Sequence, residues 1–244
     1  MQKSKESEIK TVYPEIRRVL AVGAHPDDID FGASGTVAKF VKDGAQVYYV
    51  ICTDGSRGSD DPKMTYEKLA KTRESEQRVA AKALGVKEVF FLNREDTKLV
   101  ADFELKQDIA RIIRKIKPDL IITIDPTFYY SEQGFINHTD HRAAGLATMD
   151  AFFPMARDRM TFPKLIEEGL EPHVTGEIWF VNWAGGNKKV DVTDTMDAKL
   201  AAIKCHTSQF KNFADIEKMM KSRGEGKGRN KKYFERFNAV KLGW

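Results

Sequence analysis

The fold of this chain is decided by one stretch, Val19-Leu20-Ala21-Val22-Gly23-Ala24-His25-Pro26-Asp27-Asp28, in which an apolar run leads into a histidine and two carboxylates. A short apolar run of this kind is typical of a strand buried in a parallel sheet. The polar cluster would then lie at the carboxyl end of the strand, where open α/β sheets bind their ligands. A second apolar run, 120–124, leads in the same way to His138-Thr139-Asp140-His141.

Strand and helix signals alternate along the chain. Strands are expected at about 18–24, 46–53, 88–92, 119–124 and 177–183, and helices at about 35–43, 66–84, 103–116 and 141–152. The alternation predicts an α/β fold, with a Rossmann-like, mainly parallel sheet covered by helices on both faces. If the strand order is 3-2-1-4-5, the first and fourth strands are neighbours at the point where the winding reverses. The two histidine clusters would then lie side by side.

The length and composition favour a single domain. The chain has 244 residues, of which 41% are hydrophobic, enough for one α/β domain. We expect one domain over 1–244, with a core at about 18–210 and a C-terminal extension at 211–244. Lysines, arginines and glycines are concentrated at 218–232, which predicts a basic, mobile loop.

Charge and cysteine content limit the classes of partner and compartment. The formal net charge of +4, from 40 basic and 36 acidic residues, is too small to indicate nucleic-acid binding. Cys52 and Cys205 form no ligand-like pair, which fits a reducing compartment. The polar residues 1–6 predict no secretory signal, and the apolar runs are too short to span a membrane. We therefore expect a cytoplasmic protein without a membrane span.

The two clusters contain the donors of a catalytic metal site. Imidazole nitrogens and carboxylate oxygens suit a zinc-like ion, which in catalytic sites keeps three protein ligands and one open position. The set His25, Asp28 and His141 meets this requirement and predicts one Zn²⁺ per subunit.

The remaining polar residues of the clusters are candidates for acid–base catalysis. Asp27, beside a predicted ligand, is placed to accept a proton from water. His138 could stabilise a developing oxyanion or protonate a leaving amine, with Asp140 orienting its ring and keeping it charged. The sequence leaves open whether Asp27 or His138 protonates the amine.

These motifs resemble those of one known family. Ala24-His25-Pro26-Asp27-Asp28 and His138-x-Asp140-His141 are similar to the motifs of the LmbE-like (PIG-L) zinc-dependent N-deacetylases. The resemblance extends to the loop at 53–58, to Arg73-Glu74 with Leu84-Gly85 in the next helix, and to Lys199–Ile203 with His206-Thr207-Ser208-Gln209. It covers about 18–210. Two loops depart from the family pattern, at Ser56-Arg57 and at 92–96, and both are expected to border the substrate.

The resemblance implies a hydrolase that acts on linear amide C–N bonds. It would remove the acetyl group from an N-acetylglucosamine-type sugar or glycoside and release acetate. The family pattern implies that Arg73 and Asp96 bind sugar hydroxyls, and it favours a substrate-binding role for His206. Arg57 is a further candidate, because it lies in a loop that is expected to border the substrate. The resemblance also implies that the protein is a homo-oligomer, and that its binding partner is a small N-acetylated sugar substrate.

Two other functions are less consistent with these residues. A non-catalytic metal-binding or sugar/nucleotide-binding α/β module would not explain why Asp27 and His138 lie beside the predicted ligands. An RNA- or phosphate-binding protein could use 218–232, but this segment contains Glu225 and has no stacking aromatic before Tyr233. We therefore expect no nucleic-acid partner.

Overall fold

The first strand lies in the middle of five parallel strands in the computed structural model, which describes residue 13 and residues 15–132, 134–183 and 185–243. β1 (Arg18–Gly23) pairs in parallel with β2 (Gln46–Thr53) on one side and with β4 (Leu120–Ile124) on the other. The apolar run of β1 is almost completely buried, which explains why its sequence does not alternate. Residues 1–6, from which the absence of a secretory signal was predicted, lie outside the described residues.

The described residues form a seven-stranded sheet in the order β3-β2-β1-β4-β5-β7-β6. Its other strands are β3 (Glu88–Arg94), β5 (Glu177–Val181), β6 (Lys188–Asp191) and β7 (Phe234–Lys241). The first five strands are parallel in the predicted order 3-2-1-4-5, which confirms the fold class. Sequence analysis missed the antiparallel strands β7 and β6.

The missed strand β7 has a charged residue at an inward-facing position. Glu235 is buried, accepts from the backbone N–H groups of Gly35 and Thr36, and pairs with Lys199 at 2.5 Å. This carboxylate interrupts the alternation of apolar and polar residues by which a half-buried strand is recognised. The predicted C-terminal extension therefore contributes a strand that pairs with β5.

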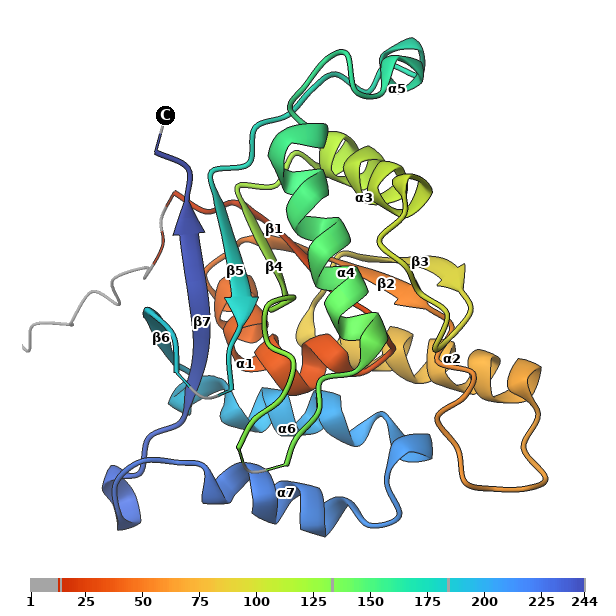
Figure 1. The fold of residues 1–244 in the computed structure, drawn as a ribbon. Helices are drawn as coiled ribbons and strands as arrows, with labels where there is room; N and C mark the ends of the chain where they lie inside the picture. The colour runs from red at the N-terminus through yellow and green to blue at the C-terminus, as the bar shows by residue number, and fades with distance from the viewer. Residues whose placement is uncertain (1–12, 14, 133, 184, 244) are drawn as a thin grey trace, which may run out of the picture.

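Helices cover both faces of the sheet (Figure 1). The cluster of buried apolar residues on one face includes residues of α1 (Asp28–Lys42), α2 (Tyr66–Leu84) and α6 (Met196–Lys204). The cluster on the other face includes residues of α3 (Phe103–Ile116) and α4 (Thr139–Asp150). The predicted bounds of α2 and α3 agree with the structure, and α4 begins two residues before its predicted start.

The first helix begins seven residues earlier than predicted. The helix predicted at 35–43 corresponds to α1, which begins at Asp28 and includes Gly32 and Ser34. Glycine is used here because neighbouring elements are close: a Cβ on Gly32 would lie 3.2 Å from Val181, and one on Gly35 would lie 2.8 Å from Val192. The early start places Asp28 in the first helical turn.

The segment predicted as a basic mobile loop begins with a helix. α7 (Phe213–Ser222) includes residues 218–222 of the 218–232 segment, so that part of the prediction is wrong. Apolar residues at 213, 216 and 220 lie on one face of α7, and Met220 packs in a cluster with Met196 of α6. The lysines of α7 lie on its solvent side, and their charge obscured this pattern.

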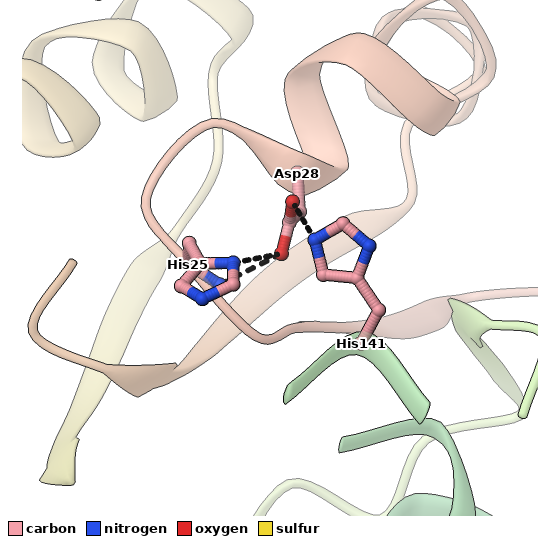
Figure 2. A group of neighbouring side chains, drawn as sticks. All are labelled: His25, Asp28 and His141. Atoms are coloured by element: carbon pink, nitrogen blue, oxygen red, sulfur yellow. Dashed lines mark hydrogen bonds and ion pairs between the residues drawn. The ribbon is translucent and has the colours of Figure 1, made fainter. Parts of the chain in front are cut away.

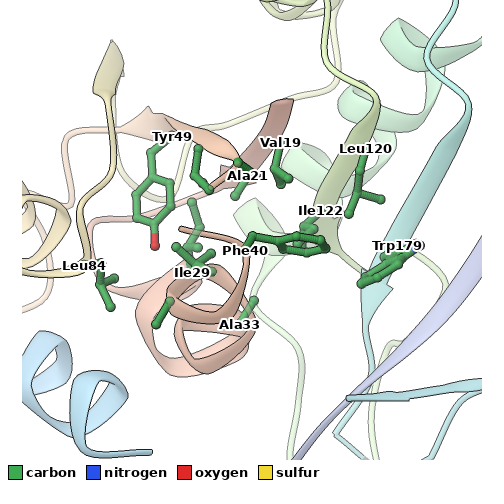
Figure 3. Packing of buried hydrophobic residues seen from close by; sticks show 14 of the residues in the cluster. Val19, Ala21, Ile29, Ala33, Phe40, Tyr49, Leu84, Leu120, Ile122 and Trp179 are labelled. Carbon is green, nitrogen blue, oxygen red and sulfur yellow. The ribbon is translucent and has the colours of Figure 1, made fainter. Parts of the chain in front are cut away.

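The core between α1 and the sheet is formed by strand residues and aromatic rings (Figure 3). Trp179 of β5 is fully buried, and its ring lies 5.8 Å from that of Phe40 of α1.

Within residues 15–132, 134–183 and 185–243, no helix is long and apolar enough to cross a membrane.

Arg114 of α3 forms hydrogen bonds with the segment that contains the short helix α5 (Pro163–Glu167). The side chain is buried, and its guanidinium donates to the carbonyl oxygens of Ala156 and Asp158 at 3.0 and 2.9 Å. Replacing Arg114 by Leu would leave these buried acceptors unpaired.

We expect Arg114→Leu to lower the free energy of unfolding by about 3 kcal/mol, measured by urea denaturation. Arg111→Leu is the matched control, because Arg111 lies on the same helix but forms only a surface ion pair with Glu168. Its cost should be below about 1 kcal/mol. Equal losses for the two variants would contradict the role of Arg114.

Candidate active site

Residues of both histidine clusters meet at the carboxyl ends of β1 and β4. His25 follows β1, Asp28 lies in the first turn of α1, and His141 lies in the first turn of α4. Because β1 and β4 are adjacent and parallel, the segments that follow them leave the same edge of the sheet. The structure thus brings together the three predicted metal ligands (Figure 2).

The carboxylate of Asp28 lies between the two imidazole rings. Its Oδ2 is 3.5 Å from His25 Nδ1, and its Oδ1 is 3.0 Å from His141 Nε2. One donor atom from each of the three residues lies within 4.8 Å of the others, so the group could hold a metal ion. Two imidazole nitrogens and one carboxylate oxygen form the donor set of many catalytic metal sites.

The ring of His141 is oriented by a residue that sequence analysis missed. Asn137 Oδ1 lies 3.0 Å from His141 Nδ1, and Asn137 Nδ2 donates to the carbonyl oxygen of Phe128 at 2.8 Å. The second contact fixes the amide with its oxygen toward the ring, so Nδ1 carries the proton. Nε2 of His141 then presents its lone pair to the site, as a metal ligand requires.

The far side of the His25 ring faces two more carboxylates. Nε2 of His25 is 3.2 Å from both Asp96 Oδ1 and Asp140 Oδ2. Burial opposes the charge on His25, but hydrogen bonds to Asp140, Asp28 and Asp96 raise its pKa well above the ordinary value. A buried imidazole whose Nε2 is held by carboxylates, with its Nδ1 beside Asp28, fits a divalent cation.

A second group that could hold a metal ion consists of His25, His138 and Asp140. The Asp140 carboxylate already accepts from the backbone N–H groups of Thr97 and Leu99, at 2.7 and 3.3 Å. Nδ1 of His138 also has a partner, the backbone N–H of Asp140. With these atoms engaged, the set of His25, Asp28 and His141 is the better candidate.

Asp27 is held in an unusual backbone conformation beside the ligands. Its φ of 107° lies in a region that L-residues rarely adopt, which costs on the order of 1–3 kcal/mol. Its backbone N–H donates to Gln77 Oε1 at 2.8 Å, and its Oδ2 accepts from Arg73 Nη2 at 3.2 Å. Burial raises the pKa of Asp27 to about 6, against the opposing charge of Arg73. A carboxyl with such a pKa can exchange a proton with water near neutral pH.

The predicted role of Asp140 toward His138 is wrong. The backbone N–H of Asp140 donates to His138 Nδ1, which caps the start of α4, while the Asp140 side chain turns away toward His25. Burial, together with the positive charge of His25, lowers the pKa of His138 below its ordinary value. His138 is therefore a neutral ring with its proton on Nε2, not an imidazolium kept charged by Asp140.

The four predicted substrate-binding residues differ in exposure. Arg57 is partly exposed, whereas Arg73 and Asp96 are each only 4% exposed, although both contact residues of the site. Their assignment to the substrate stays a prediction. His206 is fully buried and its Nε2 lies 2.8 Å from Asp30 Oδ2, so the prediction that it contacts substrate directly is wrong.

The two loops that depart from the family pattern contact each other. The backbone N–H of Arg57 donates to Asp96 Oδ2, and Arg57 Nε donates to the Asp96 carbonyl oxygen, both at 3.0 Å. Burial opposes ionisation of Asp96, but the bonds from His25 and Arg57 lower its pKa to about 2. Asp96 is thus an ionised group that links the loop containing Arg57 to the ring of His25.

Comparisons with known proteins agree with this geometry. The family model described as PIG-L, GlcNAc-PI de-N-acetylase, matches residues 20–152. A diacetylchitobiose deacetylase from Thermococcus kodakarensis is 34% identical over 202 residues, covering 83% of this chain and 73% of that protein. A 1D-myo-inositol 2-acetamido-2-deoxy-alpha-D-glucopyranoside deacetylase from Actinosynnema mirum is 28% identical, covering 81% and 82%.

The structure is also similar to a solved deacetylase. The N,N'-diacetylchitobiose deacetylase from Pyrococcus horikoshii, complexed with its inhibitor MPG, superposes with a TM-score of 0.85 and 30% sequence identity. The match covers 97% of this chain and 88% of that one. The similarity therefore extends through the C-terminal segment with α7 and β7.

We expect His25→Ala, Asp28→Ala and His141→Ala each to abolish metal binding, because two remaining protein ligands are too few to hold the ion. Metal content of the purified variants, measured by mass spectrometry, would check this. His173→Ala is the control, because the His173 ring contacts the carbonyl oxygen of Pro118, away from the site. Full occupancy in the three ligand variants would show that the metal is bound elsewhere.

Proposed function

We propose, from the premise that this chain belongs to the PIG-L family of GlcNAc-PI de-N-acetylases, that it removes the acetyl group from an N-acetylglucosamine-type sugar and releases acetate. Deacetylases of this family are metal-dependent hydrolases of N-acetyl amide bonds. The observation that carries the proposal is the convergence of His25, Asp28 and His141 with Asp27 beside them. A non-catalytic module would have no need for a strained, largely buried carboxyl at this position.

The metal is proposed to be Zn²⁺, held by His25, Asp28 and His141. Two imidazoles and one carboxylate are ligands that zinc prefers, and three protein ligands leave a position open. When bound, such an ion polarises an amide carbonyl and lowers the pKa of water. The carboxylates of Asp96 and Asp140 behind His25 would hold its ring in the binding orientation.

Asp27 is proposed as the general base. An amide is a poor electrophile, so the attacking water must lose a proton as it approaches the carbonyl carbon. Arg73 holds one carboxylate oxygen of Asp27 at 3.2 Å, which fixes the direction of the side chain. With a pKa of about 6, Asp27 is largely ionised at neutral pH and can accept that proton.

His138 is proposed to stabilise the oxyanion as a neutral hydrogen-bond donor. The bond from the Asp140 backbone fixes Nδ1 as the acceptor, so Nε2 carries the N–H. A fixed donor directed at the developing negative charge is a large term in acyl-transfer catalysis. A neutral imidazole is a very weak acid, so Asp27, once protonated, is the better donor to the leaving amine.

The substrate class is inferred from what the relatives share. One relative is named for diacetylchitobiose and another for a glucosaminyl inositol, and both names describe an acetamido group on a glucosamine ring. We infer that the substrate of this chain carries the same group. The part of the substrate that is attached to the glucosamine ring is proposed to lie near Arg57. The free cysteines Cys52 and Cys205 are consistent with a cytoplasmic location. The homo-oligomeric state implied by the resemblance stays a prediction.

Acetate release from N-acetylglucosamine, diacetylchitobiose and N-acetylglucosaminyl inositol, with zinc supplied, tests the activity. In the same assay we expect Asp27→Asn to retain zinc while its turnover falls by roughly 10²-fold or more, because an amide cannot accept the proton. The role of Asp27 as base is refuted if the zinc-loaded variant turns over at the wild-type rate. No acetate from any of these sugars would count against the sugar class itself.

For His138, two substitutions separate helix capping from catalysis. His138→Asn keeps an acceptor that can cap α4 but lacks a donor at the position of Nε2. We expect it to keep zinc and the wild-type melting temperature while turnover falls by roughly 10²-fold, as for loss of one oxyanion donor. His138→Ala should lose the same activity and some stability as well. Release of zinc from either variant would instead make His138 a ligand.

A further inference from the structure

A chain of buried polar groups lies beneath Asp27 and has no part in the proposed reaction. Gln77 of α2 accepts from the Asp27 backbone N–H at 2.8 Å, and its Nε2 donates to Asp30 Oδ2 at 2.8 Å. His206 Nε2 lies 2.8 Å from the same Asp30 oxygen, and Tyr49 donates to Asp30 Oδ1 at 3.4 Å. All four of these side chains are fully buried, so water cannot replace any member.

The hydrogen bonds that Asp30 can accept fix the orientation of the Gln77 amide. Asp30, when ionised, can only accept hydrogen bonds, so it binds the NH₂ group of Gln77 and turns the amide oxygen toward Asp27. The same carboxylate accepts a hydrogen bond from His206 Nε2, which leaves His206 Nδ1 as a buried nitrogen without a partner among the described residues. One carboxylate thereby orders two side chains from distant parts of the sequence.

The position of His206 is fixed in turn by α2. Glu76, next to Gln77, accepts from Thr207 Oγ1 and from the backbone N–H and hydroxyl of Ser208, at 2.7 to 2.8 Å. The turn that follows α6 is thus attached to the same helix that supports Asp27. The His-Thr-Ser motif at 206–208 thus attaches the turn after α6 to α2 through Thr207 and Ser208, while its histidine is buried.

We propose that Gln77, Asp30 and His206 are positioning residues, which hold Asp27 in its left-handed conformation and thereby direct its carboxylate at the reacting water. A backbone at φ 107° relaxes unless its surroundings oppose the change. The bond to Gln77 holds its N–H, while Arg73 Nη2 donates to the Pro26 carbonyl oxygen at 2.6 Å and holds the preceding peptide. The inference rests on the proposed role of Asp27 as general base.

The test is a double-mutant cycle between Gln77→Met and Asp27→Asn. Met has nearly the shape of Gln but cannot form either hydrogen bond. In the otherwise native protein, Gln77→Met should lower kcat roughly 10- to 100-fold, as expected for a misplaced catalytic group, with KM and zinc content unchanged. In the Asp27→Asn protein, where no base remains to be positioned, the same change should have little further effect.

The outcomes of the cycle distinguish the positioning role of Gln77 from the proposed role of Asp27 as general base. Equal losses in both backgrounds would indicate a general structural role and overturn the inference, as would loss of zinc or native turnover in Gln77→Met. Native turnover in Asp27→Asn would overturn the role of Asp27 itself. A crystal structure of Gln77→Met should show φ of Asp27 outside its native region, and an unchanged φ would also contradict the inference.

His206 supplies a second pair of variants if Gln77→Met does not fold. His206→Gln retains an N–H donor near the position of Nε2 and should keep most of the activity, whereas His206→Phe removes it and should lower kcat as Gln77→Met does. Thr195→Val is the matched control, because it removes a buried hydrogen bond to the Gly35 carbonyl oxygen at the far side of α1. It should lower the melting temperature but not kcat. Equal activity in His206→Gln and His206→Phe would overturn the inference.

Discussion

The site depends on one constraint, the parallel pairing of β1 with both β2 and β4. This pairing places β1 where the winding of the sheet reverses, and the segments that follow β1 and β4 leave the sheet at the same edge. His25 and His141 therefore meet although they are far apart in sequence. The direct entry of α1 after Asp27 adds Asp28 to the pair.

The second requirement of the site is balance among buried charges. Asp28, Asp96 and Asp140 all lie within 3.5 Å of the His25 ring, an arrangement that would be unfavourable without positive partners. The protonated ring offsets part of this negative charge, and a divalent cation would offset more. This excess of acceptors would favour a bound cation at the group of residues that could hold a metal ion.

The helix α2 connects chemistry with fold. Arg73 and Gln77, one turn apart, both hold the segment around Asp27, and Glu76 between them holds the turn at 206–208. Asp27, the proposed general base, is thus supported by a helix and not by the loop in which it lies, which keeps a strained residue in place. In contrast, Arg57 and Asp96 lie in two loops that are held to each other by hydrogen bonds.

The sequence alone determined the first five strands, the extents of α2 and α3, and the clusters that supply the site, because those features depend on local periodicity and spacing. The order of the five strands followed from the general rule for doubly wound sheets. It could not show that Asp140 turns toward His25 rather than His138, or that His206 is buried beneath Asp27, because both depend on contacts between distant segments. It also missed β7, since Glu235 lies at an inward-facing position only because Lys199 and two α1 amides pair with it. Tertiary structure decides the roles of buried polar residues, because their partners, and not their neighbours in sequence, make burial possible.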